Sequence, residues 1–130
     1  MDSTAKPKIF FTDLDGTLLT DDKEITPATR DALAKWTAAG NKLVLSSGRA
    51  MESVNNVRIS LGLKFPGMYL IGSNGGEIFD CGNGQMISRT PLTFQQVSLA
   101  LETAKKEGVH CHTYTDTHIV SPADDEELLY

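Results

Sequence analysis

Residues 11–19 read FTDLDGTLL and place two carboxylates, Asp13 and Asp15, directly after an apolar run. The run Ile9–Phe11 predicts a buried strand over residues 8–14 that ends at this point. Side chains two residues apart on a strand point to the same side. Open α/β sheets bind ligands beyond the carboxyl ends of their strands, so both acids are expected to face a crevice. An ordinary acidic turn is the simpler interpretation of Asp-x-Asp-Gly alone, and the apolar flanks argue against it.

Two carboxylates this close repel one another, and a hard divalent cation relieves the repulsion. Mg²⁺ binds one or two carboxylates together with waters and a substrate phosphate. Gly16 permits a sharp turn that brings backbone N–H groups close to an anion. The stretch therefore predicts a site for Mg²⁺ and a phosphate group.

The segments that follow alternate between strand and helix patterns. Thr26 and Pro27 begin a helix that ends before Gly40, and Gly62 ends a second one. The expected order is strand 8–14, helix 26–39, strand 42–46, helix 51–61 and strand 68–71. Short connections between such elements predict an α/β fold with a parallel sheet, in the order three-two-one. After Gly76 we expect a hairpin of strands 77–80 and 85–89, a helix 93–106, a hairpin of strands 109–114 and 118–120, and a helix that opens at 124–127.

The composition excludes several classes of protein. The chain has 130 residues and a net charge of −5, which fits one domain of ordinary globular type and argues against binding of nucleic acid or a membrane surface. No apolar run reaches the eighteen residues of a membrane span, and no signal peptide is expected. Cys81 and Cys111 form no metal or redox motif, so we expect reduced thiols in a cytoplasmic protein.

Residues 11–19 resemble the first motif, DxDGT, of the haloacid dehalogenase (HAD) superfamily. Residues 23–29 with 40–49, and 73–78, resemble its Cof-type sugar phosphatase branch. The resemblance implies that Asp13 is a nucleophile that forms an aspartyl-phosphate and that Asp15 is the general acid and base. It also implies that Asp13 and Asp15 hold Mg²⁺, the former through its side chain and the latter through its backbone carbonyl.

The resemblance extends to the expected phosphate-binding residues Ser47, Gly16 and Arg49. Ser47 matches the hydroxyl of the second motif, although Ser46 stays an alternative because the end of a strand can twist. Arg49 lies where this branch often has arginine, and a role as a surface cation is an equal alternative. His110 and His112 would share one strand face, but without a second pair of ligands they predict hairpin residues rather than a metal site.

The third and fourth motifs of the superfamily, a lysine and the acidic pair of GDxxNDxxM, have no match after residue 80. We therefore expect the first half of a Rossmann-like core over 1–80 and part of an α+β cap over 81–130. The first strand would then be an exposed edge through which the chain could self-associate. The expected activity is Mg²⁺-dependent hydrolysis of a small phosphorylated metabolite such as a sugar phosphate. The alternatives are a phosphotransferase or mutase of the same fold, and a non-catalytic phosphate-binding or interaction fragment.

Overall fold

The computed structural model describes residues 6–122. They fall into two compact units, one ending at Thr90 and the other beginning at Pro91. The expected core ended earlier, at residue 80. The structure divides the chain later because residues 85–89 pair with 77–80 in the sheet of the first unit.

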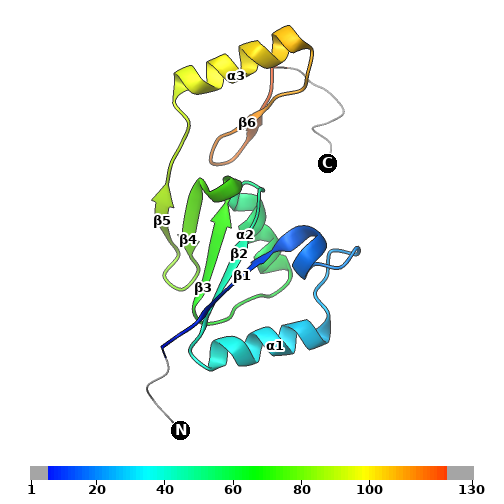
Figure 1. Cartoon of the computed structure of the whole chain (residues 1–130), viewed down its shortest axis with the longest axis vertical. Coiled ribbons are helices and arrows are strands. Elements are labelled where there is room, and N and C mark those ends of the chain that lie inside the picture. Colours follow the sequence, from blue (N-terminus) through cyan, green and yellow to red (C-terminus); the bar gives the residue numbers. More distant parts are fainter. Residues whose placement is uncertain (1–5, 123–130) are drawn as a thin grey trace. The chain divides into compact units, whose positions relative to one another are not determined.

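The first unit contains a five-stranded sheet in the order β1-β2-β3-β4-β5 (Figure 1). Its strands are β1 (Ile9–Asp13), β2 (Lys42–Ser46), β3 (Met68–Gly72), β4 (Glu77–Asp80) and β5 (Gln85–Arg89). The first three strands are parallel, and β4 and β5 continue the sheet as an antiparallel hairpin. The predicted α/β fold and the strand order three-two-one are confirmed.

Two helices supply the other half of the core of this unit. The helices are α1 (Pro27–Ala38) and α2 (Met51–Ser60). Thr26 caps α1, because its hydroxyl accepts a hydrogen bond from the Thr29 N–H at 3.2 Å. Leu45 of β2 and Leu70 of β3 are fully buried with Val54 of α2 in one apolar cluster. Leu43 and Met68, on the same face of the sheet by strand alternation, belong to this cluster too. The cluster stabilises the sheet from this face.

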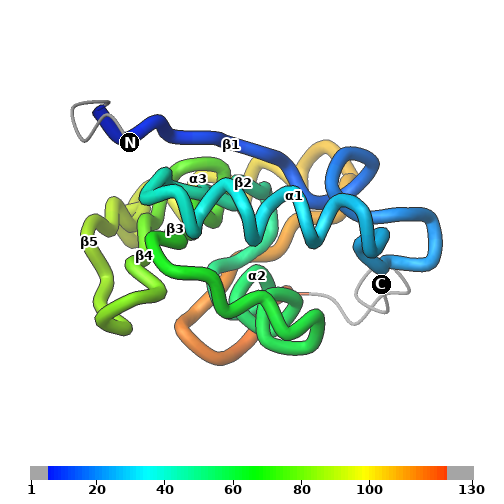
Figure 2. The backbone as a smooth tube through the Cα atoms, turned by 90° about the horizontal axis from the view of Figure 1, so that it is seen from below, coloured from blue at the N-terminus to red at the C-terminus, as the bar shows by residue number. Residues whose placement is uncertain are grey.

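β1 is an edge of the sheet, paired only with β2 (Figure 2). Ile9 and Phe11 alternate onto the face opposite the apolar cluster, and the two residues are 56% and 58% exposed. Phe10 is less exposed and lies edge-on to the ring of Trp36, with 6.2 Å between ring centroids. The expected strand 8–14 is thus present as β1 over Ile9–Asp13, but the prediction that it is buried is wrong, because its apolar side chains are open to solvent.

The second unit contains α3 (Phe94–Glu107) and a short hairpin of β6 (Thr113–Tyr114) and β7 (Ile119–Val120). A reciprocal capping box between Thr93 and Gln96 begins the helix, and Gly108 ends it with φ +69°. β6 is shorter than the expected strand 109–114, because the Val109 N–H still bonds to the Ala104 carbonyl at the helix end. The helix expected to open at 124–127 lies outside the described residues.

No helix within residues 6–122 is long and apolar enough to cross a membrane.

Candidate active site

The two carboxylates of the opening motif lie at the carboxyl end of β1. Asp13 is the last residue of β1 and stands opposite Ser46 in the register of β2. The chain then enters an irregular turn over Leu14–Leu18, in which Asp15 has φ −75° and ψ 125° and Gly16 has φ +73°. The strand therefore does not continue to Asp15, and strand alternation does not fix the orientation of that side chain. Gly16 takes the left-handed conformation that the turn requires.

The Asp15 carboxylate is bound by two cations from different parts of the chain. Arg49 donates from Nε to Oδ2 and from Nη2 to Oδ1, both at 2.8 Å. Lys23 Nζ donates to Oδ1 at 3.0 Å. The Asp15 side chain is 37% exposed, that of Arg49 34% and that of Lys23 63%. The bidentate contact with Arg49 is the stronger of the two ion pairs, because two parallel hydrogen bonds orient the carboxylate in addition to the attraction between the charges.

These cations stabilise the ionised form of Asp15. The hydrogen bonds from Arg49 and then Lys23 lower the pKa of Asp15 from 3.8 to about 2, against a smaller opposing effect of burial. The same contact raises the pKa of Arg49. Asp15 is thus an anion near neutral pH in this arrangement, and its carboxylate can accept a proton but has none to give.

The loop after β2 carries the other residues that the sequence singled out. The Ser47 N–H donates to the Ile71 carbonyl at 2.9 Å, and its Oγ accepts from the Arg49 N–H at 3.2 Å. This turn directs the loop so that the Arg49 side chain meets Asp15. The structure therefore places the Arg49 side chain against Asp15, whereas the Ser47 hydroxyl forms its hydrogen bond within its own loop.

The loop after β3 supports the one that carries Arg49. Ser73 and Asn74 have φ values of +52° and +53°, unusual for residues with side chains. The Ser73 N–H donates to the Arg49 carbonyl at 2.7 Å. A Cβ on Gly48 would lie 2.9 Å from Asn74 Oδ1, so only glycine fits at this position without a shift. Ser73 and Asn74 thus keep a strained backbone where they hold the loop that carries Arg49 in place.

Sequence reasoning missed Lys23. It belongs to a tight turn in which the Lys23 N–H donates to the Thr20 carbonyl at 2.9 Å and the Thr20 N–H donates to the Glu24 carbonyl at 2.8 Å. Lys23 has φ +61° in this turn. A lysine in a segment of mixed charge carries no signal of such a contact, since the left-handed conformation favours glycine, asparagine and aspartate.

The oxygen atoms of this site suit a hard cation such as Mg²⁺, which needs only one or two protein carboxylates. Asp13 is exposed at the end of β1. Both carboxylate oxygens of Asp15 already accept bonds from Arg49 and Lys23, so the ligand that fits from this residue is its backbone carbonyl. Within residues 6–122, no cluster of three or more His, Cys, Asp or Glu side chains is arranged to hold a metal.

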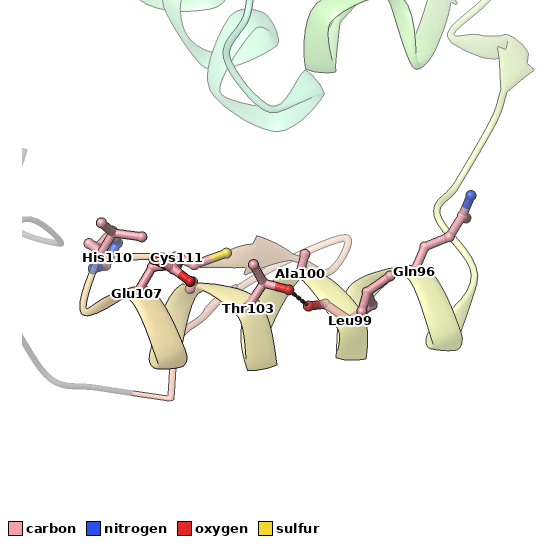
Figure 3. A pocket seen from close by; sticks show the side chains of 9 residues that line it. Gln96, Leu99, Ala100, Thr103, Glu107, His110 and Cys111 are labelled. Carbon is pink, nitrogen blue, oxygen red and sulfur yellow. Dashed lines mark hydrogen bonds between the residues drawn. The ribbon is translucent and has the colours of Figure 1, made fainter.

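The second unit has a shallow pocket of about 510 Å³ along α3 (Figure 3). Its lining is mostly apolar, with Leu99 and Ala100 from the helix and Cys111 from the segment after it, and it contains no lysine or arginine. It therefore lacks the charge that a phosphate group needs. His110 Nε2 lies 2.8 Å from His112 Nδ1, and His112 Nε2 lies 2.9 Å from the Tyr114 hydroxyl, so these rings hydrogen-bond in series.

Comparison with known proteins identifies related phosphatases. The sequence model of the haloacid dehalogenase-like hydrolase family matches residues 10–128. A 5-amino-6-(5-phospho-D-ribitylamino)uracil phosphatase of Bacillus subtilis is 31% identical over 91% of this chain and 39% of its own length. A pyridoxal phosphate phosphatase of Escherichia coli is 27% identical over 87% of this chain and 40% of its own.

Solved structures agree with these relatives. A haloacid dehalogenase-like hydrolase from B. subtilis superposes with a TM-score of 0.81 at 28% identity, over 94% of this chain and 41% of that one. The chain thus spans about 40% of the length of the proteins that it matches.

Proposed function

Because this chain belongs to the haloacid dehalogenase-like hydrolases, we propose that it supplies the nucleophile and the acid–base residue of a Mg²⁺-dependent phosphate-monoester hydrolase. The observation that carries the proposal is the cluster at the carboxyl ends of β1 and β2. It combines the exposed carboxylate of Asp13 with an Asp15 carboxylate that is held by Arg49.

Asp13 is the proposed nucleophile. One of its carboxylate oxygens attacks the phosphorus atom of the ester, and the bond from phosphorus to the ester oxygen breaks. The products of this step are an aspartyl-phosphate on Asp13 and the free alcohol. Water then attacks the phosphorus of the aspartyl-phosphate, which releases inorganic phosphate and restores the Asp13 carboxylate.

Asp15 is the proposed acid and base. It donates a proton to the leaving oxygen in the first step and accepts one from the attacking water in the second. The second step needs the ionised carboxylate, which is the form that Arg49 and Lys23 stabilise in the arrangement described above. For the first step, the contact with Arg49 has to loosen so that Asp15 can carry a proton.

Asp13 through its carboxylate and Asp15 through its backbone carbonyl are the residues that would hold Mg²⁺. When bound, the cation neutralises negative charge on the phosphate group. Ser47 through its hydroxyl, Gly16 through its backbone N–H and Arg49 through its guanidinium are the proposed ligands of the phosphate oxygens. Arg49 would take this role by turning from Asp15 to the phosphate.

The proposed substrate is a small phosphorylated metabolite such as a sugar phosphate. The B. subtilis and E. coli relatives, whose names specify a phosphorylated ribitylaminouracil and pyridoxal phosphate, support this class. The exposure of Asp13 and Gly16 agrees with a site that is open to a soluble ester.

Release of inorganic phosphate from a generic aryl phosphate, with and without Mg²⁺, tests the proposal. Asp13→Asn should abolish Mg²⁺-dependent release, whereas Asp31→Asn, a carboxylate exposed on α1, should leave it unchanged. Phosphate binding without any Asp13-dependent turnover would indicate a non-catalytic binding protein instead.

We also propose that copies of this chain associate through β1. The exposed Ile9 and Phe11 and the open edge of the sheet support this proposal, because such edges pair readily with another strand. Light scattering that finds only monomers would contradict it.

A cytoplasmic location is likewise a proposal, and the free thiols of Cys81 and Cys111 support it.

A further inference from the structure

We propose that Lys23 is a positioning residue for Asp15, which keeps the carboxylate oriented when Arg49 turns to the substrate phosphate. The assignment rests on the acid and base role proposed for Asp15. It concerns a residue outside the opening motif, brought to the site by the turn between Thr20 and Glu24.

The turn of Arg49 proposed above would deprive Asp15 of its bidentate partner. Its Nε and Nη2 both donate to Asp15, and the contact of its Nη1 with Ser53 Oγ is long, at 3.5 Å. Nη1 and the second N–H of Nη2 are thus available to a phosphate oxygen, and the two donors that hold Asp15 are released only when Arg49 turns as proposed above. Once they leave, Lys23 Nζ, at 3.0 Å from Oδ1, is the cation that remains on the carboxylate.

The backbone of the turn supports a functional role for this lysine. Lys23 adopts φ +61°, which glycine or asparagine would adopt with less strain. Two backbone hydrogen bonds between Thr20, Lys23 and Glu24 close the turn, and they do not require a lysine side chain. Strain retained at a residue whose side chain reaches the site is a reason to look for function there.

Three-bond scalar couplings that report the χ1 angle of Asp15 test the assignment by NMR on the full chain. The Arg49→Gln background removes the stronger partner, so that the effect of Lys23 can be seen. In that background Asp15 should keep one rotamer. Adding Lys23→Gly should give averaged couplings, and adding Lys23→Arg should restore the single rotamer. Lys64→Met, at an exposed lysine, is the matched control and should change nothing.

Glycine is chosen at position 23 because it suits the left-handed turn, and Lys23→Asn serves as a second variant with the same backbone preference. A residue that only shapes the turn would leave the Asp15 rotamer unchanged in both variants. That result would overturn the assignment.

Kinetics give an independent readout. With Arg49 present, Lys23→Gly should lower kcat/KM about tenfold for an alkyl phosphate, whose leaving oxygen needs a proton, and much less for an aryl phosphate. An equal loss for both esters would contradict a role through Asp15.

The two proposals fail in different ways. If Asp13→Asn retains full Mg²⁺-dependent hydrolysis, the proposed function is wrong whatever the Lys23 variants do. If Asp13→Asn abolishes hydrolysis and the Asp15 rotamer is unchanged in the Lys23 variants, only the assignment of Lys23 is wrong.

Discussion

Arg49→Gln is expected to destabilise the chain, and the loss should depend on pH. The substitution removes two hydrogen bonds of 2.8 Å that hold the Asp15 carboxylate. The lowering of the pKa of Asp15 from 3.8 to about 2 corresponds to ~2.4 kcal/mol before screening. Because the Asp15 side chain is 37% exposed and Lys23 still contributes, we expect a loss of about 1 kcal/mol at pH 6.

The sign of the pH dependence follows from the direction of the shift. The pKa of Asp15 is lower in the folded state, so its ionised form stabilises the fold above the pKa of the unfolded chain, near 3.8. This stabilisation falls as the pH is lowered through about 2. At pH 3 about half of it should remain, so the cost of Arg49→Gln should also be smaller at pH 3 than at pH 6.

Urea unfolding followed by the fluorescence of Trp36 measures this cost. Trp36 is the single tryptophan of the chain, and its Nε1 donates to the Lys42 carbonyl at 2.8 Å in the first unit. Arg58→Gln is the matched control, because Arg58 bonds to neutral partners, Asn55 Oδ1 at 2.9 Å and the Leu63 carbonyl at 3.2 Å. Its cost should be equal at pH 6 and pH 3. An equal cost of Arg49→Gln at both pH values would refute the reasoning.

Three further predictions concern catalysis, metal binding and the core. Ser47→Ala should lower kcat by about tenfold or more without changing the urea midpoint, since one hydrogen bond to the phosphate is lost; unchanged kcat would transfer the role to Ser46. Calorimetry should find Mg²⁺ binding no tighter than about millimolar for a site with so few ligands, and none in Asp13→Asn; micromolar binding would show that other ligands contribute. Leu45→Ala, in the buried cluster, should cost about 2–5 kcal/mol of unfolding free energy, whereas Ile9→Ala on the open face should cost less than about 1 kcal/mol; equal costs would contradict the described core.

Local signals made most of the fold predictable. Thr26 and Thr93 cap their helices as their sequences indicate, and Gly108 ends α3 in the left-handed conformation. The apolar run of β2 likewise gives a buried strand with the expected bounds. These features depend on a few neighbouring residues, so the sequence alone carries them.

The contacts of the site were less predictable because they depend on residues distant in the chain. The Asp15–Arg49 pair joins residues 34 positions apart, and the sequence offered phosphate binding or a surface cation for Arg49 but no contact with Asp15. The contact of Lys23 depends on a left-handed lysine in a turn, a conformation that no residue pattern indicates. The strand expected from residue 109 is shorter for a local reason, because the Val109 N–H still bonds to the Ala104 carbonyl at the end of α3.

The edge position of β1 also determines how fast its amide protons exchange with solvent. In a parallel pair, alternate residues of a strand bond to the neighbouring strand. The Lys42 N–H donates to the Lys8 carbonyl at 2.8 Å, so the N–H groups of Phe10 and Thr12 lie on the side of β2, and those of Ile9 and Phe11 lie on the open side. The amide protons of Ile9 and Phe11 should therefore exchange for deuterium within the dead time of a native-state exchange experiment. Those of Phe10 and Thr12 should stay protected. Protection of Ile9 and Phe11 is then a residue-level signal that another strand has docked on this edge.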